Sequence, residues 1–444
     1  MAKIERVNKS EISIFWFRRD LRFIDNVGLW EALQSGTPVL PIFIFDTEIL
    51  EKLPSKEDKR VCFIHDSILN LQHALVANGS SLLVMQGRPE EVFERLVEHY
   101  QIKEVYANRD YEPLAQARDK NIDDLLARHT ITFKTFKDQV IFEKAEVVKE
   151  DGTPYLIFTP YSKAWKQKLF MEGIASFPSE SLLYHLHKTK PLPIPSIEDL
   201  GFVTTKYETS PTILNEEIIR TYHLSRNIPS LLGTSNLSVH LRFGTMSIRS
   251  LVKAALTLNE QWLNELIWRE FFMAILYHFP RVVNSSFKPK YDFIEWRNNE
   301  QEFYAWCEGR TGYPLVDAGM RELNQTGFMH NRVRMVVASF LTKHLLIDWR
   351  WGEAYFADKL LDYELSSNNG NWQWAAGCGC DSAPYFRVFN PYEQIKKFDP
   401  ELLYTKKWVK NLDELDYPAP IIEHKFGRER ALKTYKKALD NFVG

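Results

Sequence analysis

Apolar and polar residues alternate in short segments over the first third of the chain. Five apolar runs, each bounded by polar or turn residues, predict strands over residues 13–17, 39–45, 81–85, 104–107 and 130–136. Helical spacing between these runs predicts helices from about residue 26 and over residues 59–76, 89–100 and 113–128. Almost continuously apolar strands that alternate with helices are typical of a parallel sheet covered on both faces. We therefore predict a doubly wound α/β domain of about five strands over residues 11–140.

The pattern changes after the fifth predicted strand. Residues 177–212 are rich in Pro, Ser and Lys, which is typical of a connector along a surface, and we place this connector at 141–212. From residue 213 onward, apolar residues recur at helical spacing almost to the end. The sequence thus predicts a second, mainly α-helical domain over residues 213–444.

Charge and composition exclude several classes of protein. A net charge of -2 excludes a histone-like basic protein, although it permits a local basic groove. No glycine-rich dinucleotide or P-loop motif follows a predicted strand. The N-terminus does not have the pattern of a secretory leader, and no apolar stretch is long enough to span a membrane, so we expect a cytoplasmic protein. Four scattered cysteines predict neither a disulfide framework nor a metal site.

Tryptophan is concentrated in the second half of the chain. Aromatic residues make up 14% of the sequence and include 12 Trp. Eight of these lie in one region, at Trp262, Trp268, Trp296, Trp306, Trp349, Trp351, Trp372 and Trp374. A large aromatic core is the ordinary explanation for each of them, but their clustering leaves a second role open.

Two helical segments carry polar residues that suit a ligand. The segment Gly233–Ser238 begins a helical stretch, where its hydroxyls and free N–H groups suit either ordinary capping or an anion. Glu265, Trp268 and Arg269 share one helix face, because they are three and four residues apart. That face suits either a solvated ion pair beside a half-buried Trp or a surface that binds a nucleobase.

Two further segments contradict the rules for a plain helical core. Arg334 lies on an otherwise apolar helix and must find a carboxylate, for which Asp362 is the candidate. His330 has no second metal ligand at helical spacing, so we interpret it as structural. Residues 366–376 combine several amides, a glycine and two tryptophans, and such a locally unfavourable helix is more often a site than a scaffold.

At this point the residues resemble a known family, that of the photolyases and cryptochromes. The similar segments are RRDLR (18–22), TPYSKAWK (159–166), GTSNLSVHLRFGTMSIR (233–249), ELIWREFF (265–272), EGRTGYPLVDAGMREL (308–323), MHNRVRM (329–335), NNGNWQWAAG (368–377) and PYFRVFNP (384–391). The resemblance covers about residues 15–391. It implies an α/β antenna domain followed by a helical domain that holds FAD, in agreement with the hydrophobic pattern.

The resemblance also implies roles for individual residues. The FAD would be contacted by Tyr222, Thr234, Ser235, Asn236, Leu237, Ser238, Trp262, Arg269, Arg334, Asp362 and Asn368. The catalytic group would comprise Glu265, Asn331 and Asn368, with electrons reaching oxidised flavin through Trp296, Trp349 and Trp372. Damaged DNA would be contacted by Arg226, Glu265, Trp268, Asn331, Arg332, Met335, Trp374, Arg387 and Gln394.

Within the family, the chain is most similar to the class I photolyases of cyclobutane pyrimidine dimers. His330-Asn331 and Met335 stand where the (6-4) photolyases carry histidines, and Asn368 stands where plant cryptochromes carry Asp and insect ones Cys. This implies a monomeric carbon–carbon lyase that flips a dimer out of UV-damaged DNA. Excited FADH⁻ would then give an electron to the dimer, the ring would split and the electron would return.

Several alternatives stay open at this point. A blue-light-receptor cryptochrome or a (6-4) photolyase is the nearest; a light-independent flavin oxidoreductase and a damage-binding module are more distant. An antenna pigment, either methenyltetrahydrofolate or a deazaflavin, would bind near Asn108–Pro113, where Glu112 aligns with a folate-contacting acid of some relatives. An ordinary helix start explains that segment equally well.

Overall fold

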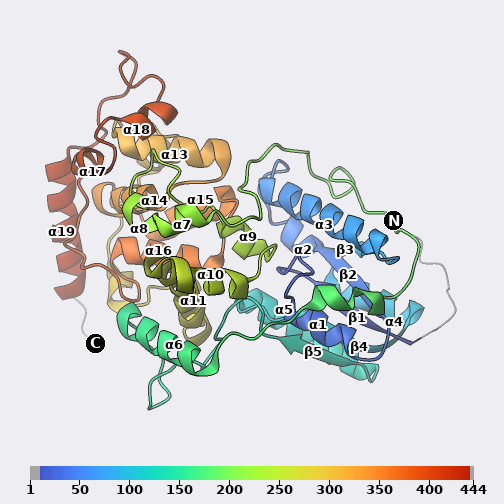
Figure 1. The fold of residues 1–444 in the computed structure, drawn as a ribbon. Coiled ribbons are helices and arrows are strands. Elements are labelled where there is room, and N and C mark those ends of the chain that lie inside the picture. Colours follow the sequence, from blue (N-terminus) through green and yellow to red (C-terminus); the bar gives the residue numbers. More distant parts are fainter. Residues whose placement is uncertain (1–10, 441–444) are drawn as a thin grey trace. The chain divides into compact units, whose positions relative to one another are not determined.

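The computed structural model describes residues 11–440, which form two compact units that are discontinuous in sequence (Figure 1). The first unit contains residues up to 143, 169–212 and 237–254, and the second contains 144–168, 213–236 and the chain from 255. No helix among the described residues is long and apolar enough to cross a membrane. The division into 11–140, 141–212 and 213–444 stays a prediction.

The first unit is built on a five-stranded parallel sheet, as predicted. Its strands are β1 (Glu11–Phe17), β2 (Val39–Asp46), β3 (Leu83–Gly87), β4 (Gln101–Asn108) and β5 (Thr132–Phe136). Their spatial order is β3-β2-β1-β4-β5, and each neighbouring pair is parallel. The direction of winding therefore reverses between β1 and β4, which is where ligands bind in open α/β sheets.

Helices cover both faces of this sheet, because right-handed crossovers reverse sides where the strand order reverses. The main helices are α1 (Val27–Leu33), α3 (Lys59–Ala77), α4 (Pro89–His99) and α5 (Pro113–Arg128), besides the short α2 (Thr47–Leu50). Ile12, Ile14 and Trp16 of β1 share a buried cluster with α4 and α5. The ring of Phe15, on the other face, lies against Gly28 of α1.

A buried polar cluster follows the carboxyl ends of β1 and β4. The Asn108 amide donates to the Asp20 carboxylate at 2.6 Å and to the Asn26 side chain at 2.7 Å. The backbone N–H of Gly28 in turn donates to the Asn108 side chain at 2.9 Å. Burial and the nearby Asp138 raise the pKa of Asp20 above its ordinary value. These bonds fix the loop after β1 and the start of α1 at the winding reversal.

The second unit is helical, as predicted. From residue 213 its α-helices are α7 (Glu216–Arg220), α8 (Tyr222–Ser225), α11 (Glu260–His278), α12 (Glu300–Cys307), α13 (Pro314–Thr326), α14 (Asn331–Ser339), α15 (Trp349–Lys359), α16 (Leu365–Ala376), α17 (Pro391–Phe398), α18 (Leu403–Trp408) and α19 (His424–Asp440). Helix α6 (Phe158–Glu172) begins in this unit, whereas α9 (Ser238–Phe243) and most of α10 (Ile248–Leu258) belong to the first. The sequence pattern did not predict α6.

Helix α16 packs against α11 and α15 (Figure 1). Glycines lie at both contacts. A Cβ on Gly370 of α16 would lie 2.2 Å from the Phe272 ring of α11. A Cβ on Gly352 of α15 would lie 2.1 Å from the Trp372 indole of α16. Contacts this short have no room for a methyl group, so the two glycines set how closely the three helices approach.

A buried lysine satisfies the C-terminal end of α16. Lys343 lies in a short π-helical turn, Phe340–His344, and its ammonium donates to the carbonyl of Ala376 at 2.7 Å and to that of Tyr385 at 3.3 Å. The ammonium also lies 3.8 Å from the centroid of the Tyr435 ring. Burial lowers the pKa of Lys343 to about 7.

Gly370→Ala is expected to destabilise the protein by about 1–3 kcal/mol, because the new methyl group overpacks against Phe272. The gain in helix propensity, about 1 kcal/mol, offsets only part of this cost. The measurement is the free energy of unfolding in denaturant. Asn371→Ala, at the next and exposed position, is the control and should stay within about 0.5 kcal/mol of the parent. Equal stability of the two variants would contradict the packing argument.

Lys343 should make stability increase with pH. Between its folded pKa of about 7 and its ordinary value of 10.5, the unfolded chain holds a proton that the folded chain has released. The free energy of unfolding therefore rises with pH in that window, by up to about 1.4 kcal/mol per pH unit. Lys343→Met should remove this component of the slope between pH 7 and 9, as measured by denaturant unfolding, whereas the exposed Lys396→Met should retain it.

Candidate functional site

The predicted polar face of α11 is present, and its acid is held by an arginine from another segment. Glu265 forms an ion pair with Arg226, which follows α8. The Gln261 amide donates to the same Glu265 Oε1 at 3.3 Å. Both charged side chains remain about a quarter exposed, at 24% for Arg226 and 27% for Glu265. The sequence analysis assigned each residue a separate role and did not predict that they pair.

One face of the Trp268 indole is covered by a ring from the start of α6. Phe158 stacks on Trp268 with ring centroids 3.8 Å apart and an interplanar angle of 4°. The Phe158 N–H donates to the Asp381 carboxylate at 3.1 Å, beyond the end of α16. Phe271 and Phe272 contact Trp268 at 5.6 and 5.5 Å. Trp268 is therefore held in a fixed orientation, and any base stacking on it must use its remaining surface.

The pairing of Arg334 with Asp362 is confirmed. The Arg334 guanidinium donates to both carboxylate oxygens, at 3.2 and 3.0 Å, and its Nε donates to the Met329 carbonyl at 2.7 Å. A second ion pair joins Arg269 of α11 to the buried Glu364 that precedes α16, at 3.0 Å. Each guanidinium thus has a carboxylate partner, which a largely buried cation requires.

Asn368 lies buried on α16 with its amide oriented by one neighbour. Its Nδ2 donates to the backbone carbonyl of Glu353 at 3.0 Å and to the Glu353 carboxyl at 2.8 Å. Burial raises the pKa of Glu353 above its ordinary value. Since the amide nitrogen is occupied, the amide oxygen is the group that Asn368 offers to a hydrogen-bond donor.

Two of the three tryptophans predicted to pass electrons are buried, and the third is partly exposed. Trp372 and Trp349 are 2% and 1% exposed. The Trp372 ring contacts Trp306 edge to face at 6.0 Å, and Trp296 contacts Tyr435 at 5.8 Å. Trp306, to which the sequence analysis assigned no role beyond the aromatic core, is thus a direct neighbour of Trp372. The electron path itself stays a prediction.

Three arginines, Arg226, Arg332 and Arg387, form an arginine cluster. Arg332 donates to the Asn227 side chain at 2.6 Å and lies over the Phe398 ring at 4.4 Å. Burial, and then the charges of Arg226 and Arg387, lower the pKa of Arg332. Like charges this close make a local positive surface on a chain with little net charge.

His330 has a structural role at the edge of the arginine cluster, as expected. Its Nδ1 accepts the Arg332 N–H at 3.1 Å and so caps α14. Burial and the charges of Arg332, Arg334 and Arg226 lower the pKa of His330 to about 4, which keeps the ring neutral. Asn331 and Arg387 are exposed, whereas Met335, Trp374 and Gln394 are partly buried.

The segment predicted to bind the diphosphate changes its unit assignment along the chain. Thr234–Asn236 belong to the second unit, whereas Leu237 and Ser238 belong to the first. Helix α9 has Leu237 as its N-cap residue and no side-chain cap. The Thr234 hydroxyl donates to Asn236 at 3.0 Å, and Asn236 has a positive φ of 51°. Ordinary capping therefore does not account for the hydroxyls of this segment.

The segment predicted to bind an antenna is held by ion pairs within the first unit. Arg19 contacts Asp110 at 3.1 Å and Glu112 at 2.9 Å, and Arg242 contacts Glu112 at 3.0 Å. Glu112 is the N-cap residue of α5, but its side chain makes no capping bond. A simple helix start therefore does not explain this acid.

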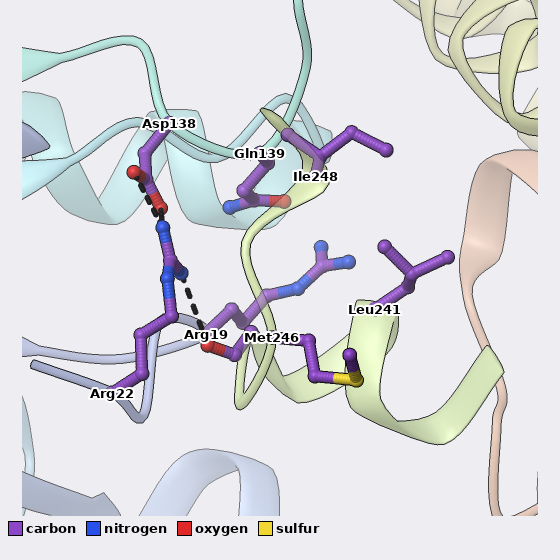
Figure 2. Close-up of a pocket in the computed structure, with 8 residues that line it drawn as sticks. Arg19, Arg22, Asp138, Gln139, Leu241, Met246 and Ile248 are labelled. Carbon is purple, nitrogen blue, oxygen red and sulfur yellow. Dashed lines mark hydrogen bonds and ion pairs between the residues drawn. The ribbon is translucent and has the colours of Figure 1, made fainter. Parts of the chain in front are cut away.

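A small pocket of the first unit lies beside these arginines (Figure 2). On one side, the Arg22 guanidinium donates to both Asp138 oxygens at 2.8 Å and to the Gly244 carbonyl at 3.0 Å. Arg249 contacts Asp138 at 2.9 Å. Burial alone would raise the pKa of Asp138, but these two guanidiniums hold it below its ordinary value. Met246 and Leu241 supply the apolar side of the pocket (Figure 2).

Comparison with known proteins defines the class of this two-part molecule. Residues 13–180 match the model described as DNA photolyase, and residues 262–416 match the model described as the FAD binding domain of DNA photolyase. The chain therefore belongs to the DNA photolyase family. The second unit accordingly carries the FAD-binding domain of that family.

Individual relatives cover nearly the whole chain. The deoxyribodipyrimidine photo-lyase of Vibrio cholerae is 37% identical, over 96% of this chain and 99% of its own length. That of a Synechococcus strain is 34% identical over 96% of both chains. The crystal structure of a class III photolyase from Agrobacterium tumefaciens is 32% identical, has a TM-score of 0.83 and covers 99% of this chain and all of its own.

Phe158→Leu should destabilise the second unit by about 0.5–1.5 kcal/mol, the value of an aromatic pair beyond its buried area. The leucine retains an apolar side chain but cannot stack on Trp268. Thermal unfolding of the flavin-loaded protein measures the effect. Phe170→Leu is the matched control, because Phe170 lies on the same helix and is 90% exposed. Equal melting temperatures of the two variants would show that the stack contributes nothing.

Proposed function

We propose that this protein is a deoxyribodipyrimidine photo-lyase, which splits cyclobutane pyrimidine dimers of UV-damaged DNA in light. The observation that carries the proposal is the position of Glu265 and Trp268 on one face of α11, joined through Arg226 to the arginine cluster. A hydrogen-bonding acid, a flat apolar ring and a positive rim together match a damaged base with its phosphates. The relatives named for this activity are similar over almost the full chain.

The residues around α16 suit a flavin. We infer that the FAD is held by Tyr222, Thr234, Ser235, Asn236, Leu237, Ser238, Trp262, Arg269, Arg334, Asp362 and Asn368. The unused amide oxygen of Asn368 would accept a hydrogen bond from a flavin N–H, and hydroxyls outside helix capping suit the diphosphate. When bound and reduced, the cofactor supplies the electron that light moves to the dimer.

The lesion is recognised by stacking and by hydrogen bonds. Flipping a base out of the duplex costs a few kcal/mol, and less for a damaged one. Stacking on an aromatic ring returns about 1–3 kcal/mol per base, so Trp268 and Trp374 can offset the cost. Glu265 and Asn331 hydrogen-bond the dimer, and Met335 packs on it. Phosphates are held by the arginine cluster and Gln394.

Electrons for reducing an oxidised flavin pass through Trp372, Trp349 and Trp296 in this proposal. Trp372 is buried next to Trp306, whose indole N–H donates to the Val337 carbonyl at 3.1 Å. A charge on Trp372 could therefore move to Trp306 instead of Trp349. Variants of the two routes can be compared directly.

An antenna pigment, methenyltetrahydrofolate or a deazaflavin, would bind the first unit. A second FAD is a third candidate for the pigment. A photolyase of Sulfolobus tokodaii, whose structure contains two FAD molecules, is 35% identical to this chain with a TM-score of 0.78. The ion pairs of Glu112 with Arg19 and Arg242 leave this acid less available to a folate. We further propose that the enzyme is a cytoplasmic monomer.

A receptor function is the second candidate. A cryptochrome of Synechocystis has a TM-score of 0.83 and is 26% identical to this chain. The similarity covers 96% of the chain, but the sequence identity is lower than that to the photo-lyases. A (6-4) lesion is a further alternative substrate, and the repair assay below includes it.

The test is light-driven repair by purified, reduced, flavin-loaded protein. Cyclobutane dimers in an oligonucleotide should disappear under blue light and persist in the dark, as measured by chromatography, whereas a (6-4) lesion should persist in both.

Trp296→Phe should slow photoreduction of oxidised flavin and spare repair by pre-reduced enzyme. Trp306→Phe is the comparison that separates the two routes. Absence of flavin absorbance, or dimers that survive illumination, would refute the proposal.

A further inference from the structure

The arginine cluster contains a single ion pair within residues 11–440, the one between Arg226 and Glu265. Arg332 is bonded to a neutral amide and lies over an aromatic ring. Arg387 lies 6.0 Å from the ring of Phe389. The carboxylate of Glu265 is therefore the one negative charge bonded directly to this positive surface in the described part of the chain.

Glu265 is built to hold Arg226 firmly. Its Oε1 accepts from both the Arg226 guanidinium and the Gln261 amide, so two donors fix one oxygen. The Arg226 guanidinium also lies 5.3 Å from the centroid of the Tyr222 ring, which limits its movement. The N–H groups that Arg226 gives to Glu265 are not free for a phosphate, and the carboxylate repels a phosphate that approaches the cluster.

We propose that Glu265 determines specificity by restraining the arginine cluster from binding undamaged DNA. The part of this inference that concerns the lesion rests on the proposed function. A flipped lesion offers Glu265 a base N–H, which compensates for the unfavourable charge, whereas undamaged DNA offers no such donor. An unfavourable contact that only the correct partner relieves raises the ratio between the two affinities. Because non-specific sites vastly outnumber lesions, that ratio matters more than either affinity alone.

The experiment measures binding in the dark, with the flavin-loaded protein. A labelled undamaged duplex and the same duplex with one cyclobutane thymine dimer are titrated with wild type, Glu265→Gln, Arg226→Gln and the double variant. Salt is varied from about 50 to 200 mM, because each phosphate contact makes the slope of log affinity against log salt more negative by about 0.9.

Glu265→Gln should bind the undamaged duplex about three- to tenfold more tightly, with a slope steeper by about 0.9 for one freed guanidinium. It should lose discrimination between the two duplexes by at least the same factor. The Glu265→Gln substitution should have a smaller effect in the Arg226→Gln background, since the restrained guanidinium is then missing. Tighter binding of undamaged DNA together with a loss of discrimination is not expected from a merely structural role.

Glu260→Gln is the matched control for the loss of one negative charge. Glu260 lies on the same helix, is exposed, and pairs with Lys166 at 2.7 Å rather than with the arginine cluster. The affinity of the Glu260→Gln variant for undamaged DNA should stay close to that of wild type. If Glu265→Gln loses its flavin, Glu265→Ala is measured in its place, with flavin absorbance as the check on folding.

Unchanged or weaker binding of undamaged DNA by Glu265→Gln overturns this inference. That outcome leaves the proposed function intact if the wild type still splits dimers in light. Conversely, a tightened complex with undamaged DNA supports the restraint even where no lesion is repaired, because the measurement needs no photochemistry. The two failures are therefore distinguishable.

Discussion

The close approach of three helices at Gly370 and Gly352 is the constraint on which the second unit depends. Each position allows no more than a hydrogen atom, because a Cβ would lie 2.2 Å from the Phe272 ring or 2.1 Å from the Trp372 indole. Helix α16 carries Asn368, Trp372 and Trp374, and α11 carries Glu265 and Trp268. Any side chain at these glycines would separate the helices and so shift these residues relative to one another.

Buried charge in this unit is balanced locally. Arg334 has Asp362, Arg269 has Glu364, and Lys343 is satisfied by carbonyls and by a ring instead of an acid. Such pairs are weak sources of stability, but removing one partner leaves a costly unpaired charge. The arginine cluster differs from these buried groups, because its ion pair with Glu265 leaves it with a net positive charge. A net charge of -2 is therefore compatible with binding to DNA.

Local periodicity explains what could be predicted from the sequence and what could not. The strands and helices of the first unit follow from alternating apolar runs, and the Arg334–Asp362 pair follows from the cost of an unpaired buried cation. The stack of Phe158 on Trp268 and the pair of Arg226 with Glu265 join residues far apart in sequence, and neither has a local signature. Helix α6 was missed because its weak apolar pattern lies next to a proline- and serine-rich stretch.

The tryptophans show why burial and function are not alternatives in such a unit. A ring that passes charge must lie close to other rings, and a packed core supplies such neighbours. Trp306 is 0% exposed, donates its N–H to Val337 and touches Trp372, so the same contacts that mark it as core also qualify it as a neighbour for charge. Packing density alone therefore cannot distinguish tryptophans that only pack in the core from those that would also transfer electrons. In the proposed path, what would separate them is the order in which the rings meet the flavin, and α16 carries both Asn368 and Trp372, the residues proposed to lie nearest to it.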